Sequence, residues 1–331
     1  MADLPTPGSV PAPPGIHTRR PERGDAEAVA AVMGAAETAA CGHSLVSSGD
    51  LLFDWADPRF SLARDAWVAV DTQERVVAYA CSFGTDPANA IDLTCVVHPD
   101  VDGAGLDEHL MGLVLRRAAE QADDAGVQRR DVTLAVACMR GDTRRRELFE
   151  RLGFVHTRVF LRMVIATEDL PEAPPWPDGI TVAAFRPGAD DHALHGVIQE
   201  AFLDHYHAAP VPFDVWSAQV FGDEDFDPEL VLVARDSDEA VGAVVALPIP
   251  GAGYVDQLAV RRPWRGRGLG TALLVHALHL LAARGYERLY LGVDSQSITG
   301  ADRLYRRIGM RPQRENDLYE RRLGAGATGS A

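Results

Sequence analysis

The chain has 331 residues, of which 47% are hydrophobic, so it can build about two packed domains. Its formal net charge of −16 excludes a general nucleic-acid-binding role, because phosphate binding requires a basic surface. The 4 cysteines form no CxxC pair and no apolar run approaches the roughly 20 residues of a membrane span. We therefore expect no metal site, no nucleic-acid partner and no membrane anchor.

The first half of the chain begins with a proline-rich segment, MADLPTPGSVPAPPG, which lacks the apolar stretch of a signal peptide. It predicts a flexible arm over residues 1–15 and a cytoplasmic protein. Strands then alternate with helices, which is typical of an α/β or α+β domain over residues 16–166. Helices are predicted at 25–40, 106–125 and 143–152, and strands at 66–71, 75–84, 91–99, 131–138 and 154–165.

The second half repeats this order of elements after a proline-rich linker over residues 167–179. The segment GADRLYRRIGM corresponds to TRRRELFERLGF of the first half, which indicates an internal duplication. We therefore predict a second domain over 180–323 and a short flexible tail over 324–331. Strands are predicted at 180–185, 230–235, 240–247, 254–260, 288–294 and 318–323, and helices at 190–206, 211–220, 269–284 and 300–308.

The most informative segment is the glycine-rich turn Arg265-Gly266-Arg267-Gly268-Leu269-Gly270, which joins a strand to a long helix. A helix start presents unpaired N–H groups and a partial positive charge, so it forms an anion site. A phosphate-binding P-loop needs a lysine, which this chain lacks, and the glycine spacing does not fit a dinucleotide fingerprint. A plain strand-to-helix connection is the simpler alternative.

The turn resembles the R-x-x-G-x-G turn of the GNAT N-acetyltransferases, and GADRLYRRIGM resembles that family's second signature, A-x-x-L-Y-x-x-x-G-F. The resemblance implies two tandem GNAT folds, each with a mixed central sheet splayed open after its fourth strand, and acetyl-CoA as co-substrate. It places the pantetheine arm on one strand, the pyrophosphate on the turn, and one further contact at a position where the family often has asparagine. The implied coenzyme-binding residues are Leu258, Ala259, Val260, Arg265, Gly266, Arg267, Gly268, Leu269, Gly270, Thr271 and Ser297.

Acetyl transfer to an amine needs a base for the ammonium group and an acid for the departing thiolate. Alternation along YVDQLAV puts Tyr254, Asp256, Leu258 and Val260 on one face, and Asp256 matches a carboxylate position of the family. Asp256 is the candidate base, with a hydrogen-bonded strand-end aspartate as the alternative. Tyr305 matches the family's general acid, with a packed core tyrosine as the alternative.

The first half is predicted to be a degenerate copy. In its turn, HPDVDGAGLDEHL, the arginine position is Asp102 and the last glycine position is Asp107. Both carboxylates would repel a pyrophosphate by roughly 1 kcal/mol per charge pair even in water. The tyrosine position is Phe149, which has no proton to donate. We expect this half to shape the substrate cleft, although weak coenzyme or acceptor binding stays open.

Two-domain members of this size include the mycothiol synthases, to which AFLDHYHAAPVPFDVW is similar. That resemblance implies substrate contacts from His205, Tyr206, His207, Trp216 and Tyr254. Those enzymes carry a carboxylate at the position of Tyr254 and a tyrosine at that of Gly292, so another small amine is the expected acceptor. A non-catalytic acetyl-CoA-binding scaffold and a protein N-acetyltransferase are the alternative functions, and the oligomeric state stays open.

Overall fold

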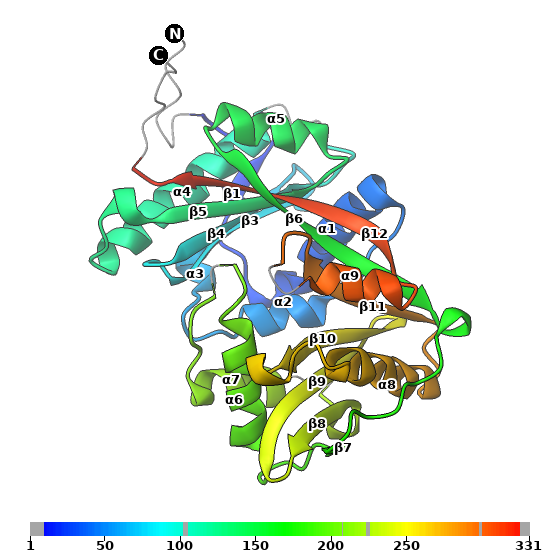
Figure 1. The fold of residues 1–331 in the computed structure, drawn as a ribbon. Coiled ribbons are helices and arrows are strands. Elements are labelled where there is room, and N and C mark those ends of the chain that lie inside the picture. Colours follow the sequence, from blue (N-terminus) through cyan, green and yellow to red (C-terminus); the bar gives the residue numbers. More distant parts are fainter. Residues whose placement is uncertain (1–9, 102–104, 207, 223–225, 298–299, 325–331) are drawn as a thin grey trace, which may run out of the picture. The chain divides into compact units, whose positions relative to one another are not determined.

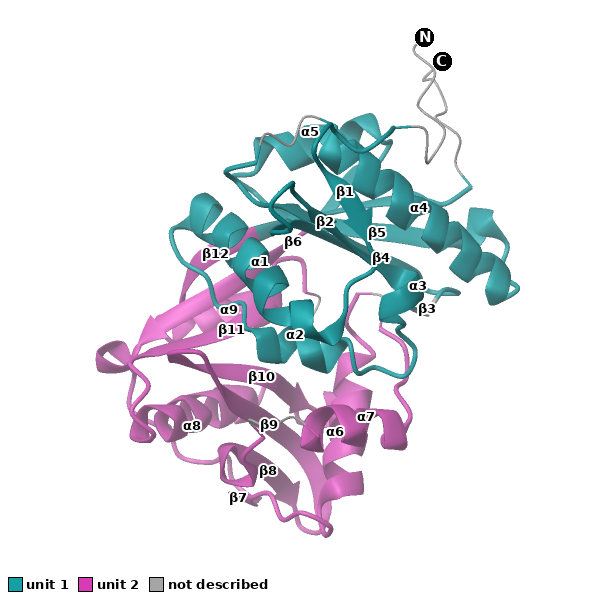
Figure 2. Cartoon of the chain, turned by 180° about the vertical axis from the view of Figure 1, so that it is seen from behind, with its two compact units in different colours: residues 1–158, 316–331 teal, residues 159–315 magenta. Residues whose placement is uncertain are grey.

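A computed structural model describes residues 10–101, 105–206, 208–222, 226–297 and 300–324. The chain divides into two compact units, shown in separate colours in Figure 2. Unit 1 comprises Met1–Arg158 and Asn316–Ala331, and unit 2 comprises Val159–Glu315. Most of the predicted arm and tail lies outside the described residues, so their flexibility stays a prediction.

Unit 1 is a mixed sheet with helices packed on it (Figure 1). Its strands lie in the order β1-β2-β3-β4-β5-β12; β4 and β5 run parallel, and the other pairs run antiparallel. Its helices are α1 (Ala26–Cys41), α2 (Ser48–Asp54), α3 (Leu62–Asp65), α4 (Leu106–Asp124) and α5 (Thr143–Arg151). Its strands are β1 (His17–Arg19), β2 (Ala66–Val70), β3 (Val76–Asp86), β4 (Ala90–Val97), β5 (Thr133–Met139) and most of β12 (Arg311–Arg322).

Unit 2 repeats the design, with strand order β6-β11-β10-β9-β8-β7 and a parallel pair at β10 and β11. The predicted fold class, a mixed sheet flanked by helices in each half, is therefore confirmed. Its helices are α6 (Asp191–Phe202), α7 (Phe213–Phe221), α8 (Leu269–Ala283) and α9 (Ala301–Arg307). Its strands are most of β6 (Val155–Ala166), then β7 (Ile180–Ala184), β8 (Val231–Asp236), β9 (Glu239–Ile249), β10 (Ala252–Val260) and β11 (Arg288–Asp294).

The last strand of each sequence half completes the sheet of the other unit. β6 follows α5 in the chain, yet its residues 160–166 pair antiparallel with β11 in unit 2. β12 follows α9, yet its residues 316–322 pair antiparallel with β5 in unit 1. From the sequence, β6 was assigned to the domain over 16–166 and β12 to the domain over 180–323, following their order in the chain. The alternation of apolar residues indicates which face of a strand is buried, but it does not indicate which strand it pairs with.

Alternating side chains on β9 separate two apolar clusters of unit 2. Val244 and Ala246 pack with the leucines of α8, whereas Ala243 and Val245 pack with Leu194 and the other apolar residues of α6. In a strand, successive side chains point to opposite faces, so α8 and α6 cover opposite faces of the same sheet. The two helices hold β9 and β10 between them.

The segment predicted to be a linker, 167–179, lies along α8 within unit 2. The Nε2 atoms of His276 and His279 lie 3.0 and 2.9 Å from the carbonyl oxygens of Pro174 and Pro171. The Trp176 ring stacks on that of His276, with ring centroids 4.0 Å apart. These contacts fix the path of the chain into β7.

Candidate active site

The sheet of unit 2 opens between two of its central strands. β10 pairs in parallel with β11 only from Gly253 to Val255, opposite Leu289 to Leu291. β10 then continues to Val260, paired with β9 on its other side, and within the described residues no further pair joins it to β11. Beyond Val255, one edge of β10 therefore has no strand partner among the described residues. The predicted pantetheine contacts Leu258, Ala259 and Val260 lie on this part of β10, and their role stays a prediction.

The turn after β10 has the backbone geometry of an anion site. Gly266 and Gly268 have φ values of 74° and 87°, a region that L side chains adopt only at a cost. Gly268 is the N-cap of α8, so the amides that follow, from Leu269 to Thr271, have no acceptor within the helix. They lie at the positive end of the helix dipole, where anions are stabilised.

The side chain of Arg265 is held by the protein rather than projected toward a ligand. Its Nε donates to the carbonyl of Val260 at 2.8 Å, and its Nη1 donates to Asp204 at 2.5 Å. Arg262 pairs with the same carboxylate. Hydrogen bonds from Arg262 and then Arg265 lower the pKa of Asp204 to about 2, so the ion pairs stay formed at neutral pH. Arg265 thus braces the turn, while Arg267 is exposed, and its contact with a ligand stays a prediction.

If acetyl-CoA binds at this turn, as the sequence predicts, Arg265→Ala should weaken its binding roughly 10-fold, because the change removes charge-assisted hydrogen bonds that hold the turn. The loss should be similar at low and high salt, since the side chain acts through position. Arg267→Ala, the matched control, should cost about 3-fold at low salt and almost nothing in 0.5 M salt, where exposed charges are screened. Calorimetric titration at both salt concentrations measures this; a loss on Arg265→Ala that salt abolishes would contradict the bracing role.

Asp256 occupies a β-bulge, which the sequence did not reveal. Tyr254 and Val255 lie opposite Leu247 and Ala246 of β9, but Gln257 lies opposite Val245, so Asp256 is the extra residue. The prediction that Tyr254, Asp256, Leu258 and Val260 share one face is therefore wrong. Leu258 and Val260 lie with Val255 in the apolar cluster under α8. Tyr254 points to the opposite face of the sheet, as Gln257 does. A bulge adds one residue, shifts the alternation by one and re-aims a side chain, here the exposed Asp256.

Tyr254 lies two residues before Asp256 in β10, and Tyr305 of α9 is close enough to Tyr254 to interact with it electrostatically. The hydroxyl of Tyr254 lies 3.0 Å from the point that a Cβ of Gly292 would occupy. Burial, followed by the charge of Asp256, raises the pKa of Tyr254. Burial, with Tyr254 adding to it, raises the pKa of Tyr305 on α9 to about 12. Tyr254 therefore interacts electrostatically with both Asp256 and Tyr305, and both phenols are protonated at neutral pH.

The remaining predicted residues differ in their burial and in the charges around them. His205 is close enough to feel the charges of Asp294 and Arg265, and desolvation lowers its pKa. Tyr206 is half-buried beside it, Ser297 is half-buried in the turn after β11, and His207 lies outside the described residues. Trp216 is only 3% exposed and packs against His195 and Phe221, so the structure assigns it to the core rather than to substrate contact.

The corresponding helix start in unit 1 shares the glycine N-cap but has a buried carboxylate as its second residue. Gly105, the N-cap of α4, has a φ of 84°, close to the φ of 87° of Gly268, the N-cap of α8. Asp107, the second residue of α4, is 5% exposed and pairs with Arg144 at 2.8 Å. Burial raises the pKa of Asp107, which Arg144 opposes. Phe149 is fully buried against Tyr319, and Asp102 lies outside the described residues.

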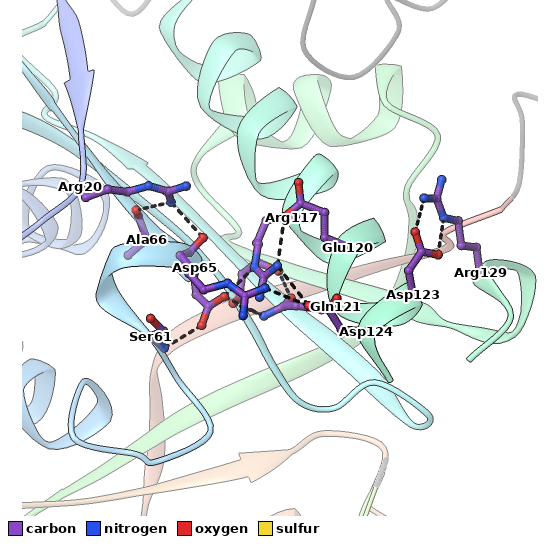
Figure 3. A network of polar contacts seen from close by, with 12 residues as sticks. Arg20, Ser61, Asp65, Ala66, Arg117, Glu120, Gln121, Asp123, Asp124 and Arg129 are labelled. Atoms are coloured by element: carbon purple, nitrogen blue, oxygen red, sulfur yellow. Dashed lines mark hydrogen bonds and ion pairs between the residues drawn. The ribbon is translucent and has the colours of Figure 1, made fainter. Parts of the chain in front are cut away.

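Unit 1 also buries a charged network around α4 (Figure 3). Asp65 is 3% exposed and accepts from Nε of Arg117 at 2.7 Å and from Nε2 of Gln121 at 3.3 Å. The hydroxyl of Ser82 donates to Gln121 at 2.6 Å. A buried charge is tolerated when its partners satisfy it, and these contacts join α3 and β3 to α4. We interpret this network as structural.

The described helices include none long and apolar enough to cross a membrane. Over the same residues, no group of three or more His, Cys, Asp or Glu side chains is arranged to hold a metal ion. Sequence reasoning missed Asp204, which lies beside the predicted His205 but whose partner arginines are about 60 residues away in the chain. Only the fold reveals that pairing.

Comparison with known proteins finds a model described as Acetyltransferase (GNAT) family over residues 196–310. A mycothiol acetyltransferase of Acidothermus cellulolyticus is 30% identical over 284 residues, covering 80% of this chain and 81% of the relative. A mycothiol acetyltransferase of Tsukamurella paurometabola is 32% identical over 240 residues, covering 68% of this chain and 76% of the relative.

Two solved structures extend the likeness to the whole fold. A GCN5-related N-acetyltransferase from Sphaerobacter thermophilus superposes with a TM-score of 0.79 at 30% identity, covering 96% of this chain and 98% of that chain. A tandem GNAT protein from the clavulanic acid biosynthesis pathway superposes with a TM-score of 0.68 at 14% identity, covering 94% of this chain and 99% of that chain. The latter shares the fold alone.

Proposed function

Because the chain belongs to the acetyltransferase (GNAT) family, we propose that it moves an acetyl group from acetyl-CoA directly to a primary amine of a small molecule. We further propose that unit 2 performs the chemistry. The observation that carries this assignment is the contrast between the two helix starts: the second residue of α8 is Gly270, after a glycine turn, whereas the second residue of α4 is the buried Asp107.

The residues of unit 2 fit acetyl-CoA. The amides from Arg265 to Thr271 would hold its pyrophosphate, and Leu258 and Ala259 on the open edge of β10 would pair with its pantetheine. The carbonyl of Val260 accepts a hydrogen bond from Arg265, so the backbone amide of Val260 is the group that would remain for the pantetheine. When bound, acetyl-CoA supplies the activated acetyl thioester.

The side chains at the opening match the two proton transfers of the reaction. Asp256 would take a proton from the ammonium group of the acceptor, directly or through water, since a primary amine has a pKa near ~10. Tyr305 would give its phenolic proton to the departing thiolate. The cysteines are Cys41, Cys81, Cys95 and Cys138, all in the first half, which favours direct transfer over an acetyl-cysteine intermediate.

The test is a panel of small primary amines assayed with acetyl-CoA by following the release of free CoA. Turnover with at least one amine, confirmed by mass spectrometry of an acetylated product, would support the proposal. Tight acetyl-CoA binding without turnover of any amine would refute it and would favour the non-catalytic alternative. Activity restricted to peptide amino termini would favour a protein N-acetyltransferase.

Asp256→Asn should lower kcat/KM at pH 7 by about 100-fold or more, the usual contribution of a positioned base. The deficit should shrink as pH rises, because the variant depends on the fraction of amine that is already neutral, and that fraction grows about tenfold per pH unit below ~10. Asp256→Glu should recover part of the rate. A pH–rate profile parallel to that of the unmodified enzyme would exclude Asp256 as the base.

A further inference from the structure

Three arginines at the entry to the glycine-rich turn are held by the end of α6. Arg262 and Arg265 both pair with Asp204, which lies two residues beyond the last residue of α6. One helical turn earlier, a carboxylate oxygen of Glu200 lies 3.2 Å from Nε of Arg261. Ion pairs between segments about 60 residues apart in the chain therefore join the end of α6 to the turn.

The Asp204 carboxylate is the centre of these contacts. Its side chain is only 6% exposed, and it accepts hydrogen bonds from both Arg262 and Arg265. Arg265 in turn donates from its Nε to the carbonyl of Val260, the last residue of β10. A buried charge is tolerated when its partners satisfy it, and here the partners are two guanidinium groups. One connected set of hydrogen bonds therefore runs from α6 through Asp204 and Arg265 to β10.

The charge of Asp204 and its hydrogen bonds have opposite expected effects on an anionic ligand. Asp204 contacts Arg265, the first residue of the turn where the pyrophosphate of acetyl-CoA is proposed to lie. A carboxylate near an anion site repels the anion, so the charge alone would weaken acetyl-CoA binding. The hydrogen bonds fix the side chain that braces the turn, so they would strengthen acetyl-CoA binding. Because the two effects differ in sign, one substitution can separate them.

We propose that Asp204 is a positioning residue for acetyl-CoA: it holds Arg265, and through Arg265 the end of β10, in the arrangement that the pyrophosphate needs. This inference rests on the proposed function. The positional effect outweighs the repulsion, because two guanidinium groups already offset the charge of Asp204, whereas loss of their shared acceptor releases both arginines at once. Removal of a negative charge beside the anion site should therefore weaken binding of the anion.

The experiment is a calorimetric titration of acetyl-CoA into Asp204→Asn, which removes the charge and hardly changes the size of the side chain. We expect the dissociation constant to rise roughly 10-fold, about what a charge-assisted hydrogen bond contributes. The rise should persist at high salt, where repulsion between exposed charges is screened. In steady-state kinetics, the increase in KM for acetyl-CoA should exceed any decrease in kcat, because the change affects the coenzyme turn and not the proton transfers.

Glu200→Gln is the matched control, because it removes the same charge one helical turn earlier. Its partner Arg261 keeps a second carboxylate, that of Glu239 at 2.7 Å, so the dissociation constant should stay within about 2-fold. A double-mutant cycle with Arg265→Gln locates the effect: the double variant should bind acetyl-CoA no more weakly than the weaker single variant. Thermal unfolding without ligand shows that each variant is folded.

Unchanged or tighter binding of acetyl-CoA by Asp204→Asn would overturn the inference and leave the proposed function intact. So would losses that add in the cycle with Arg265→Gln, or an equal loss on Glu200→Gln. Absence of acetyl-CoA binding by the unmodified chain would instead refute the proposed function, and this inference with it. Binding without turnover of any amine would refute the proposed function alone, since the titrations still measure the role of Asp204.

Discussion

Replacing Tyr305 with phenylalanine is expected to lower kcat about 100-fold, while the dissociation constant for acetyl-CoA changes less than about 2-fold. The side chain is 7% exposed and packs under α8, so removal of one hydroxyl leaves its packing intact. Its pKa of about 12 keeps the proton on the phenol at neutral pH, where it is available to a thiolate. Steady-state kinetics and a calorimetric titration separate the two effects.

Tyr286→Phe is the matched control, because Tyr286 is a half-buried tyrosine of the same unit in the turn between α8 and β11. It should leave kcat within about 2-fold, as expected for a surface substitution away from the chemistry. If Tyr305→Phe also keeps full turnover, Tyr305 is a core residue and another group protonates the thiolate. A shifted acetyl-CoA affinity with unchanged kcat would point to a binding role.

Gly270→Asp is expected to weaken acetyl-CoA binding at least about 100-fold, because it places a carboxylate at the second residue of α8, where unit 1 carries Asp107 at the second residue of α4. Each charge pair about 4 Å apart costs roughly 1 kcal/mol in water and about 4 kcal/mol near a protein surface. Two such pairs against a pyrophosphate account for a loss of that size. Titration of acetyl-CoA into the variant measures it directly.

Gly270→Ala separates charge from bulk. A Cβ at 270 would lie 3.6 Å from Val260 and 3.7 Å from Leu304, which are ordinary contacts, so alanine should retain most of the affinity. The reciprocal change in unit 1, Asp102→Arg with Asp107→Gly, should raise coenzyme stoichiometry from one towards two. An unmodified chain that already binds two coenzymes, or a Gly270→Ala variant as weak as Gly270→Asp, would refute the electrostatic account.

Much of the fold follows from local patterns. The helix predicted at 269–284 is α8 (Leu269–Ala283), and the strand predicted at 254–260 is β10 (Ala252–Val260). Helical and strand periodicity depend on neighbours within one element, so a single sequence carries them. The short helices α2 and α3 were not predicted, because elements of 7 and 4 residues give too little periodicity to detect.

Only part of the candidate site was predicted correctly, because a single sequence shows features that depend on neighbouring residues and not those that depend on distant ones. The glycines of the turn were found because their role is local: Gly266 and Gly268 adopt left-handed backbone that glycine permits. The face of the sheet to which Tyr254 points was predicted wrongly, because the extra residue Asp256 shifts the in-and-out alternation of side chains along β10 by one position. Trp216 was selected as a substrate contact from its place in a motif, although packing places it in the core.

The sequence by itself therefore determined the order of elements, the duplication, and the intact turn at 265–270 opposed to the acidic turn of the first half. The tertiary structure decided which edges the strands join, so that β6 and β12 exchange sheets and Arg162 comes to lie across from Gly292. It also decided that Arg265 braces the turn through Asp204. The physical reason is that backbone conformation and helix-end charge are set by nearby residues, whereas strand partners and ion pairs depend on segments far apart in the chain.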